Sequence, residues 1–407
     1  MGFACTQKDF GTGAESSFAK VEIAADGKIT LHHTGAEIGT GVSTSQAIAC
    51  AKWLGKPAAE VRMAIIDWPE LPIVTSGDPY MMSQGEQDKL SANPRWSPGL
   101  ISPASATNSA FYFTHSTHEA ARVVFTHGLW PAAMAIWSGG IGGGQAAPLV
   151  VRREEARWVE GKLTAAGLEP LPLEQLASKA HDLGLVTGAV VHVFNRWQWS
   201  EAEFDIDGVT ERLPVDGLSL LLGAGKAGAR SGAAPVPPVY RALDRKRVFI
   251  APVSRNNAAV TYYSAVGTLV GLAVNEASGH VSLLSHHSIM ECGNMLSPQL
   301  VSGQLQGGLA MGIGHALHEY LPLYEDGPGN GTWNFNRYHL PRASDVAVWA
   351  QTGEVLPPLS ETDPPKGIAE VVMIPVVGAI VNGIAHAIGH RFNDLPVTPQ
   401  NIQEALA

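Results

Sequence analysis

The sequence predicts a mixed α/β fold, of the α+β kind, with several mixed sheets flanked by helices. Residues 19–33 alternate apolar and polar side chains as strands do, and a loop containing glycines follows at 35–41. Residues 46–54 then show a helical pattern, and residues 59–67 alternate again as a strand. This order of strand, loop, helix and strand is typical of mixed α/β architecture.

The composition indicates a compact globular protein and argues against two classes of partner. Of the 407 residues, 45% are hydrophobic and 16% are charged, which leaves little sequence of the disordered kind. The formal net charge of −10 comes without a long basic run. We therefore expect neither nucleic acid nor an anionic membrane surface as a partner.

The cysteines and the first residues favour a cytoplasmic location. Cys5, Cys50 and Cys292 lie far apart, so they match neither a disulfide framework nor the C-x-x-C spacing of a zinc or iron–sulfur site. The first ten residues lack the basic and apolar stretches of a signal peptide.

The first elements are a β-hairpin and a capped helix. Strands at 19–24 and 28–33 are joined by an Ala-Asp-Gly turn. For the helix at 46–54, Ser43 to Ser45 are N-cap candidates, and Gly55 stands at the C′ position.

The later elements follow from the same patterns. We expect an irregular loop at 80–100, a helix after 102–108, a helix at 172–184, flexible connections at 138–145 and 224–238, two strands joined by a turn at 268–289, and a helix at 302–321. Residues 371–389 form an apolar run that is shorter than the roughly 20 residues of a membrane span and is interrupted by polar side chains. We interpret this run as a buried strand followed by a buried helix, and expect no membrane span.

The composition shifts divide the chain into three parts. Residues 1–138 form a first lobe, 139–245 a connecting region, and 246–407 a second lobe.

Three familiar motifs do not support their usual functions. The G-x-G-x-x-G at 223–228 is followed by glycine and prolines, which leave no helix N-terminus to receive a pyrophosphate. The order H-x-x-H-E at 315–319 is not that of zinc proteases. His386 and His390 have no evident third metal ligand.

Three segments rich in small residues are suited to holding a large polar ligand. Gly39, Thr40 and Gly41 precede a helix, residues 104–108 precede another, and Gln304 lies in a glycine-rich helix. Small side chains leave backbone N–H groups accessible, and helix N-termini favour anions. Each segment taken separately is more often a turn or a helix-packing feature.

A single carboxylate, Glu370, stands where the apolar run begins. Partial desolvation there is expected to raise the pKa of Glu370 toward the range of a general base. Considered without its neighbours, the residue reads more simply as a surface glutamate at the start of a strand.

The order of these segments resembles the second half of the molybdenum-binding subunit in the xanthine dehydrogenase and aldehyde oxidase family. The resemblance rests on GAEIGTG, SPASATNS, ECGNMLSP, GQLQGG, NFNRYHLPRASD, KGIAE and LPVTPQNI, which occur in that order along nearly the whole chain. It is weakest between about residues 139 and 245. The fold that it implies is a molybdenum-cofactor-binding domain.

The resemblance implies a role for individual residues. Glu370 matches the family's catalytic base, and Lys366 and Gly367 match its lead-in. The residues that match cofactor contacts are Gly39, Thr40, Gly41, Ser105, Ala106, Thr107 and Gln304. Thr40 stands where many members have glutamine and is similar to the bacterial aldehyde-oxidising branch. Ala369 and Met311 also depart from the family pattern, replacing glycine and glutamine.

The implied function is oxidation of an aldehyde to a carboxylic acid with oxygen from water. The cofactor would be molybdopterin, in its cytosine dinucleotide form, with molybdenum held by the pterin dithiolene and by no protein side chain. The partners would be a chain that supplies the first half of the molybdenum subunit, an iron–sulfur subunit, and a flavin or cytochrome (haem) subunit. Hydroxylation of an N-heteroaromatic ring by the same chemistry is the alternative, and a non-catalytic cofactor-binding scaffold is another.

Overall fold

The computed structural model consists of two compact units. It describes residues 1–11, 15–101, 106–139, 151–225, 239–251, 262–321, 334, 336–343 and 350–407. The terminal unit combines Met1–Gly11 with Tyr262–Ala407, and the central unit comprises Thr12–Thr261.

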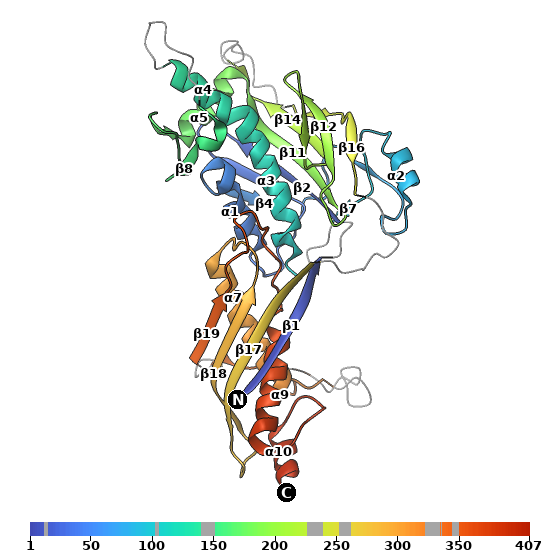
Figure 1. Cartoon of the computed structure of the whole chain (residues 1–407), viewed down its shortest axis with the longest axis vertical. Coiled ribbons are helices and arrows are strands. Elements are labelled where there is room, and N and C mark those ends of the chain that lie inside the picture. Colours follow the sequence, from blue (N-terminus) through green and yellow to red (C-terminus); the bar gives the residue numbers. More distant parts are fainter. Residues whose placement is uncertain are drawn as a thin grey trace. The chain divides into compact units, whose positions relative to one another are not determined.

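A mixed sheet forms the centre of the central unit (Figure 1). Its strands are, in spatial order, β15 (Arg241–Leu243), β14 (Gly217–Leu222), β11 (Val186–Asn195), β2 (Glu15–Ile23), β3 (Ile29–His33) and β4 (Glu60–Arg62), with β7 (Leu100–Ile101) beside β2. The β3–β4 and β2–β7 pairs are parallel and the other pairs are antiparallel.

Both faces of this sheet are covered at its centre, which explains why β11 is buried along its whole length. Val191 and its neighbours on one face join a core with helices α1 (Val42–Leu54), α3 (Tyr112–Val124), α4 (Trp130–Gly139) and α5 (Leu173–Leu183). Val190 on the other face packs with Phe18, Trp68 and Leu71.

Smaller elements surround this core. They include α2 (Gln84–Leu90), a π-helical turn at Phe125–Leu129, and three small sheets. The first sheet is made by β8 (Arg157–Val159), β9 (Lys162–Thr164) and β10 (Leu171–Pro172). The second is made by β12 (Glu201–Ile206), β13 (Val209–Leu213) and β16 (Arg247–Phe249), and the third by β5 (Val74–Thr75) and β6 (Trp96–Ser97).

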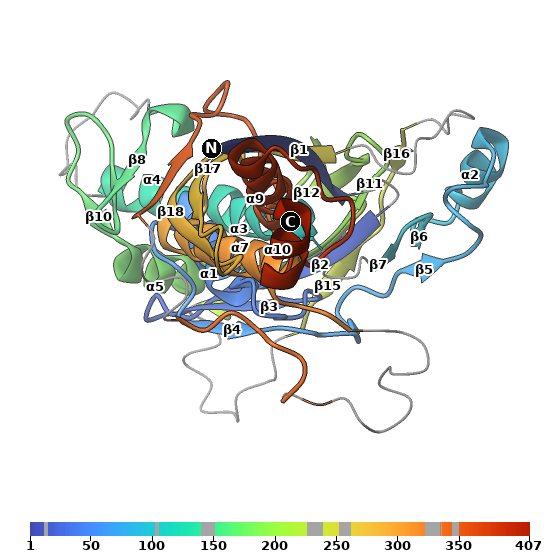
Figure 2. The same cartoon turned by 90° about the horizontal axis from the view of Figure 1, so that it is seen from below.

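The terminal unit is a four-stranded sheet with helices on one face (Figure 2). Its strands, in spatial order, are β1 (Gly2–Gly11), β17 (Tyr262–Val274), β18 (Val281–Glu291) and β19 (Ala350–Val355). Its helices are α7 (Pro298–Leu317), α9 (Met373–Ile388) and α10 (Pro399–Leu406). Helix α9 packs across β1 and β17, and α7 packs against α9.

Glycines on one side of α7 allow its close approach to α9. A Cβ atom at Gly308 would lie 2.8 Å from Val372 Cβ, and one at Gly312 would lie 2.4 Å from Val376 Cγ1. Gly303 and Gly307 have nothing within 4 Å of such an atom. The glycine-rich segment therefore has a packed side and an open side.

The fold class and most of the predicted elements are confirmed. The first hairpin is β2 and β3, and Gly55 ends α1 in the left-handed conformation with φ of 75°. The helix predicted at 172–184 is α5, and the two strands predicted at 268–289 are β17 and β18. The connections predicted at 138–145 and 224–238 lie mainly outside the described residues.

Two predictions of secondary structure were wrong. The run 371–389 is not a strand followed by a helix, because α9 occupies Met373–Ile388. Pro375 lies in its first turn, where a missing N–H costs no helical hydrogen bond. The loop predicted at 80–100 contains α2, which Ser83 and Glu86 cap reciprocally. No helix in the described parts of the chain is long and apolar enough to cross a bilayer.

The boundaries of the two units differ from the predicted ones, which fell between residues 138 and 139 and between residues 245 and 246. Strands β11 and β14, from the supposed connecting region, pair in the same sheet as β2. Strand β1 pairs with β17 and so joins the C-terminal part of the chain.

We predict that Gly312→Ala lowers the stability of the terminal unit by about 1–3 kcal/mol, because the new methyl group overlaps Val376. Gly307→Ala is the matched control on the same helix, and should raise stability by about 0.5–1 kcal/mol through helix propensity. Urea unfolding of both variants measures this. Equal effects would mean that the two helices do not pack as described.

Candidate functional site

Glu370 lies in a turn directly before α9, with its backbone in the left-handed region. Its φ is 63°, which non-glycine residues adopt rarely. The Glu370 side chain is 56% exposed, and Lys8 Nζ on β1 lies 3.9 Å from its Oε2. The carboxylate is thus presented at the surface of the terminal unit with one positive charge beside it.

The segment that leads to Glu370 is firmly held. The backbone N–H of Lys366 donates to Cys292 O at 2.9 Å, and its ammonium lies 2.5 Å from Glu291 Oε2. The buried Ser264 hydroxyl donates to Gly367 O at 2.8 Å. These contacts tie the turn to β17, β18 and the loop after β18.

The expectation of a desolvated Glu370 at the start of a strand was therefore wrong for this chain. Its neighbours Ile368, Ala369 and Val371 are buried, but the turn directs the carboxylate outward. Any desolvation of Glu370 requires a further surface over it.

Gln304 lies on α7, near the helix's open side. Its side chain is half-buried and makes no hydrogen bond within the described part of the chain. Gln306, two residues further on, instead donates to Ser302 Oγ at 3.2 Å. The open positions Gly303 and Gly307 leave room for a ligand beside the Gln304 amide.

The Gly39–Gly41 loop is organised by a residue that the sequence analysis did not single out. Oε1 of Glu37 accepts hydrogen bonds from the N–H groups of Gly39 (2.9 Å) and Gly41 (3.0 Å). Oε2 accepts from the N–H (3.0 Å) and the hydroxyl (3.1 Å) of Ser43. The N–H groups of Gly39 and Gly41, which we expected to face a ligand, are thus bound to Glu37.

This arrangement also corrects the predicted N-cap. Helix α1 begins at Val42 after Gly41, and none of the candidates Ser43 to Ser45 occupies the cap position. Burial raises the pKa of Glu37, but the hydrogen bonds from Ser43, Gly39 and Gly41 outweigh this effect and hold that pKa below the usual glutamate value. An acidic residue shortly before a helix was the available sequence signal.

Ala106 and Thr107 also have strained backbones. Their φ angles are 50° and 55°, and Thr107 directly precedes a short 3₁₀ helix at Asn108–Ala110. Among the described residues, seven non-glycine residues have positive φ, and three of them are Ala106, Thr107 and Glu370. Such strain is often kept at functional sites. Ser105 lies outside the described residues.

A buried glutamine brings these two loops of the central unit together. Gln46 on α1 donates to Ser109 O at 3.3 Å and to Thr114 Oγ1 at 3.0 Å, and it accepts from Thr117 at 2.7 Å. From the sequence, Gln46 was only the first residue of a predicted helix, because a lone glutamine carries no motif. Its contacts hold the start of α1 beside the 3₁₀ helix that follows Thr107.

The residues present fit a pterin better on α7 than at the start of α1. The Gln304 amide offers a donor and an acceptor beside open space, as a polar planar ligand requires. At the start of α1 the carboxylate of Glu37 occupies the donors. Across the described ranges, no group of three His, Cys, Asp or Glu side chains is placed to hold a metal ion.

Comparison with known proteins gives consistent matches. The family described as molybdopterin cofactor-binding domain matches residues 1–74 and 240–347. The chain is 32% identical over 138 residues to the xanthine dehydrogenase molybdenum-binding subunit of Escherichia coli, covering 34% of this chain and 18% of that protein. It is 28% identical over 146 residues to the aldehyde oxidoreductase molybdenum-binding subunit of Escherichia coli, covering 34% and 19%.

A solved structure shows the same fold over the whole chain. Quinoline 2-oxidoreductase from Pseudomonas putida 86 matches with a TM-score of 0.60 at 18% identity, covering 100% of this chain and 41% of that one. The curated relatives are matched over about a fifth of their own length.

We predict that Glu37→Ala lowers the free energy of unfolding by about 1 kcal/mol at pH 7, as loss of a helix cap does. The loss is smaller to the extent that water replaces the hydrogen bonds of the Glu37 carboxylate. Glu37→Gln keeps one acceptor oxygen and should lose less. Because the pKa of Glu37 is lowered in the folded chain, its contribution is present at neutral pH and is lost as pH falls through that lowered pKa. Urea unfolding at pH 7 and pH 3 tests this. A difference between wild type and Glu37→Ala that is the same at both pH values would contradict it.

Proposed function

This chain belongs to the molybdenum hydroxylase family, and from this premise we propose that it is the second half of a catalytic subunit that oxidises an aldehyde to a carboxylic acid. Bound molybdopterin would supply the two-electron redox centre. The chain's own part is to hold the cofactor and to provide the base.

Glu370 is the residue that carries this proposal. It is a single carboxylate on a strained turn whose lead-in is fixed by Ser264, Cys292 and Glu291. A base must hold one position while it accepts a proton, and a rigid backbone provides that. Glu370 would take the proton from a water-derived oxygen as that oxygen attacks the carbonyl carbon of the aldehyde.

The proposed cofactor contacts follow the resemblance. Gln304 would hydrogen-bond the pterin, and Lys366 and Gly367 would position the base. The remaining proposed contacts are Gly39, Thr40, Gly41, Ser105, Ala106 and Thr107. The cofactor would be the cytosine dinucleotide form.

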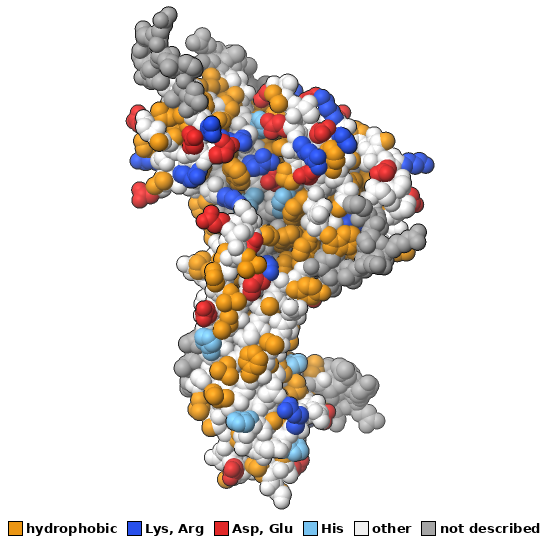
Figure 3. Space-filling model, viewed as in Figure 1, with side chains coloured by type: hydrophobic (Ala, Val, Ile, Leu, Met, Phe, Trp, Pro, Cys, Tyr) orange, Lys and Arg blue, Asp and Glu red, His pale blue; other side chains and the backbone are white. Residues whose placement is uncertain are grey.

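Exposed apolar residues support association with another chain. Phe3, Leu269 and Ile289 occupy neighbouring pairs on the face of the terminal sheet opposite α9, and are 58%, 41% and 39% exposed. Figure 3 shows hydrophobic side chains on the visible face of this unit, with few charged ones among them. Contiguous apolar surface of this kind marks an interaction site. We propose that a chain with the first half of the subunit covers it, and that an iron–sulfur subunit and a flavin or cytochrome subunit complete the enzyme.

The three cysteines are free thiols, which suits the cytoplasmic location that we propose.

Hydroxylation of an N-heteroaromatic ring is the second candidate reaction. The similarity to a xanthine dehydrogenase subunit favours it, whereas Gly-Thr-Gly at 39–41 and the similarity to an aldehyde oxidoreductase subunit favour an aldehyde. A turnover screen of aldehydes against purines, nicotinate and quinolines, with the assembled enzyme, decides between them. Turnover of the ring compounds alone would exclude the aldehyde assignment.

We predict that Glu370→Gln lowers the rate per molybdenum by at least about 10²-fold, because the amide cannot accept the proton. Molybdenum content and melting temperature should stay close to wild type, since the side chain is exposed. Glu361→Gln is the matched control, an exposed glutamate in the same segment, and should keep full activity. An intact rate in Glu370→Gln would rule out the base and leave a cofactor-binding scaffold.

We predict that Gln304→Ala lowers molybdenum content while leaving the rate per molybdenum unchanged. The lost hydrogen bond to the pterin is worth roughly 0.5–1.5 kcal/mol. Gln306→Ala on the same helix removes a hydrogen bond to Ser302 and should retain normal content. Elemental analysis with activity on one preparation measures both quantities. Equal molybdenum content in the two variants would show that Gln304 does not contact the cofactor.

A further inference from the structure

The central unit contains a pocket that none of the proposed cofactor-binding residues lines. We propose that this pocket binds a small, uncharged, planar aromatic molecule that carries an O–H or N–H donor. The lining of the pocket and a buried histidine in its wall support this proposal, which does not depend on the proposed function.

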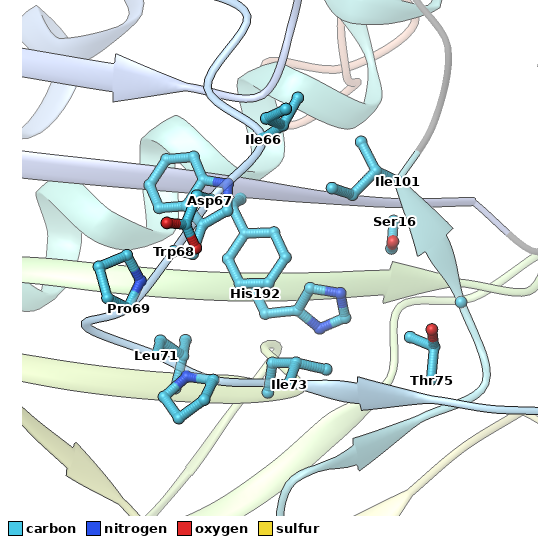
Figure 4. Close-up of a pocket in the computed structure, with 13 residues that line it drawn as sticks. Ser16, Ile66, Asp67, Trp68, Pro69, Leu71, Ile73, Thr75, Ile101 and His192 are labelled. Carbon is cyan, nitrogen blue, oxygen red and sulfur yellow. The ribbon is translucent and has the colours of Figure 1, made fainter.

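The pocket is of ligand size and mainly apolar. Its volume is about 470 Å³, which lies within the range of small-molecule sites. The segment 66–75 forms one side of it, and residues of β2 and β11 form another (Figure 4). The rings of Phe18 and Trp68 stack with centroids 5.1 Å apart and an interplanar angle of 10°. These features suit a flat aromatic ligand.

A buried polar group, His192, lines this apolar pocket. It projects from β11 on the face that carries Phe18, and its ring centroid lies 4.6 Å from that of Phe18. Only 1% of the His192 residue surface is exposed. Figure 4 shows the imidazole among the lining residues, in the region of Ser16, Ile73 and Thr75.

Two charged residues, Asp216 and Arg245, lie behind His192. His192 Nδ1 lies 3.2 Å from Asp216 Oδ2, and Arg245 Nη1 donates to Asp216 Oδ1 at 2.9 Å. Burial raises the pKa of Asp216, but the contacts with His192, Arg245 and Ser97 hold that pKa below its usual value. Because Nδ1 faces this carboxylate, we assign the imidazole proton to Nδ1.

This tautomer leaves Nε2 as a hydrogen-bond acceptor. Nε2 has no hydrogen-bond partner within the described part of the chain. In a mainly apolar pocket, an acceptor at Nε2 favours a ligand with a matching donor. The lining contains no Lys or Arg, and its one carboxylate, Asp67, lies at the exposed rim, which disfavours anions.

The test compares two probes with the same naphthalene ring on the purified full-length chain. 2-Naphthol carries an O–H donor, and 2-methoxynaphthalene has the same ring without one. Isothermal titration calorimetry should show that 2-naphthol binds about twofold to tenfold more tightly, as one hydrogen bond allows. His192→Phe keeps an aromatic ring without the acceptor, and should reduce this ratio to about one.

A second variant keeps the proposal falsifiable should His192→Phe not fold. Thr75 is exposed and lines the pocket, so Thr75→Trp should fill it and abolish binding of both probes. Val159→Trp, at an exposed strand position outside the pocket, is the control and should bind both probes as wild type does. Failure of 2-naphthol to bind the wild-type chain, or its unchanged binding to Thr75→Trp, would overturn the site. Equal affinities of the wild-type chain for the two probes would overturn the role of Nε2.

Discussion

The close approach of α7 and α9 determines where two polar side chains of the terminal unit, Gln304 and Glu370, lie. Gly308 and Gly312 have no side chains, so Val372 and Val376 of the neighbouring segment fill the space beside them. Gln304 lies one helical turn before Gly308, and Glu370 lies two residues before Val372. Both groups therefore take their positions from one packed contact. Because protein interiors are close-packed, a larger residue at that contact would shift the two elements apart.

Backbone strain is the second constraint, and it explains why the lead-in to Glu370 is held so firmly. A left-handed conformation of a non-glycine residue costs about 1–3 kcal/mol and persists only where its surroundings impose it. For Glu370 these surroundings are the buried neighbours Ile368 and Val371, together with the hydrogen bond from Ser264 to Gly367 O. The strained turn directs one carboxylate away from an otherwise apolar helix start. An extended strand at this point would alternate its side chains and would not single out one polar group.

The sequence was informative where local chemistry decides the structure, and less so where tertiary contacts do. The hairpin of β2 and β3 and the end of α1 at Gly55 follow from turn and cap residues. The helical state of 373–388 could not be read from the apolar run, because a buried strand and a buried helix share that pattern. The positive φ angles of Ala106 and Thr107 have no sequence signature, since neither is glycine. The carboxylate of Glu37 at the start of α1 depends on the loop closing back, which spacing alone does not specify.

The exposed state of Glu370 bears on how the work is divided between this chain and its proposed partner. A general base works best when desolvation and neighbouring charges bring its proton affinity near the working pH. This chain fixes the position of the carboxylate and places Lys8 beside it, but leaves 56% of the side chain exposed. The amide of Gln304 likewise makes no hydrogen bond among the described residues. The chain thus fixes where Glu370 and Gln304 lie. The low-dielectric surroundings that strengthen their electrostatic interactions must come from the surface that covers them. The apolar face that carries Phe3 and Leu269 is consistent with a covering chain. We propose that the fold of the chain fixes the position of the Glu370 carboxylate, while its proton affinity as the proposed base is set by the proposed covering chain.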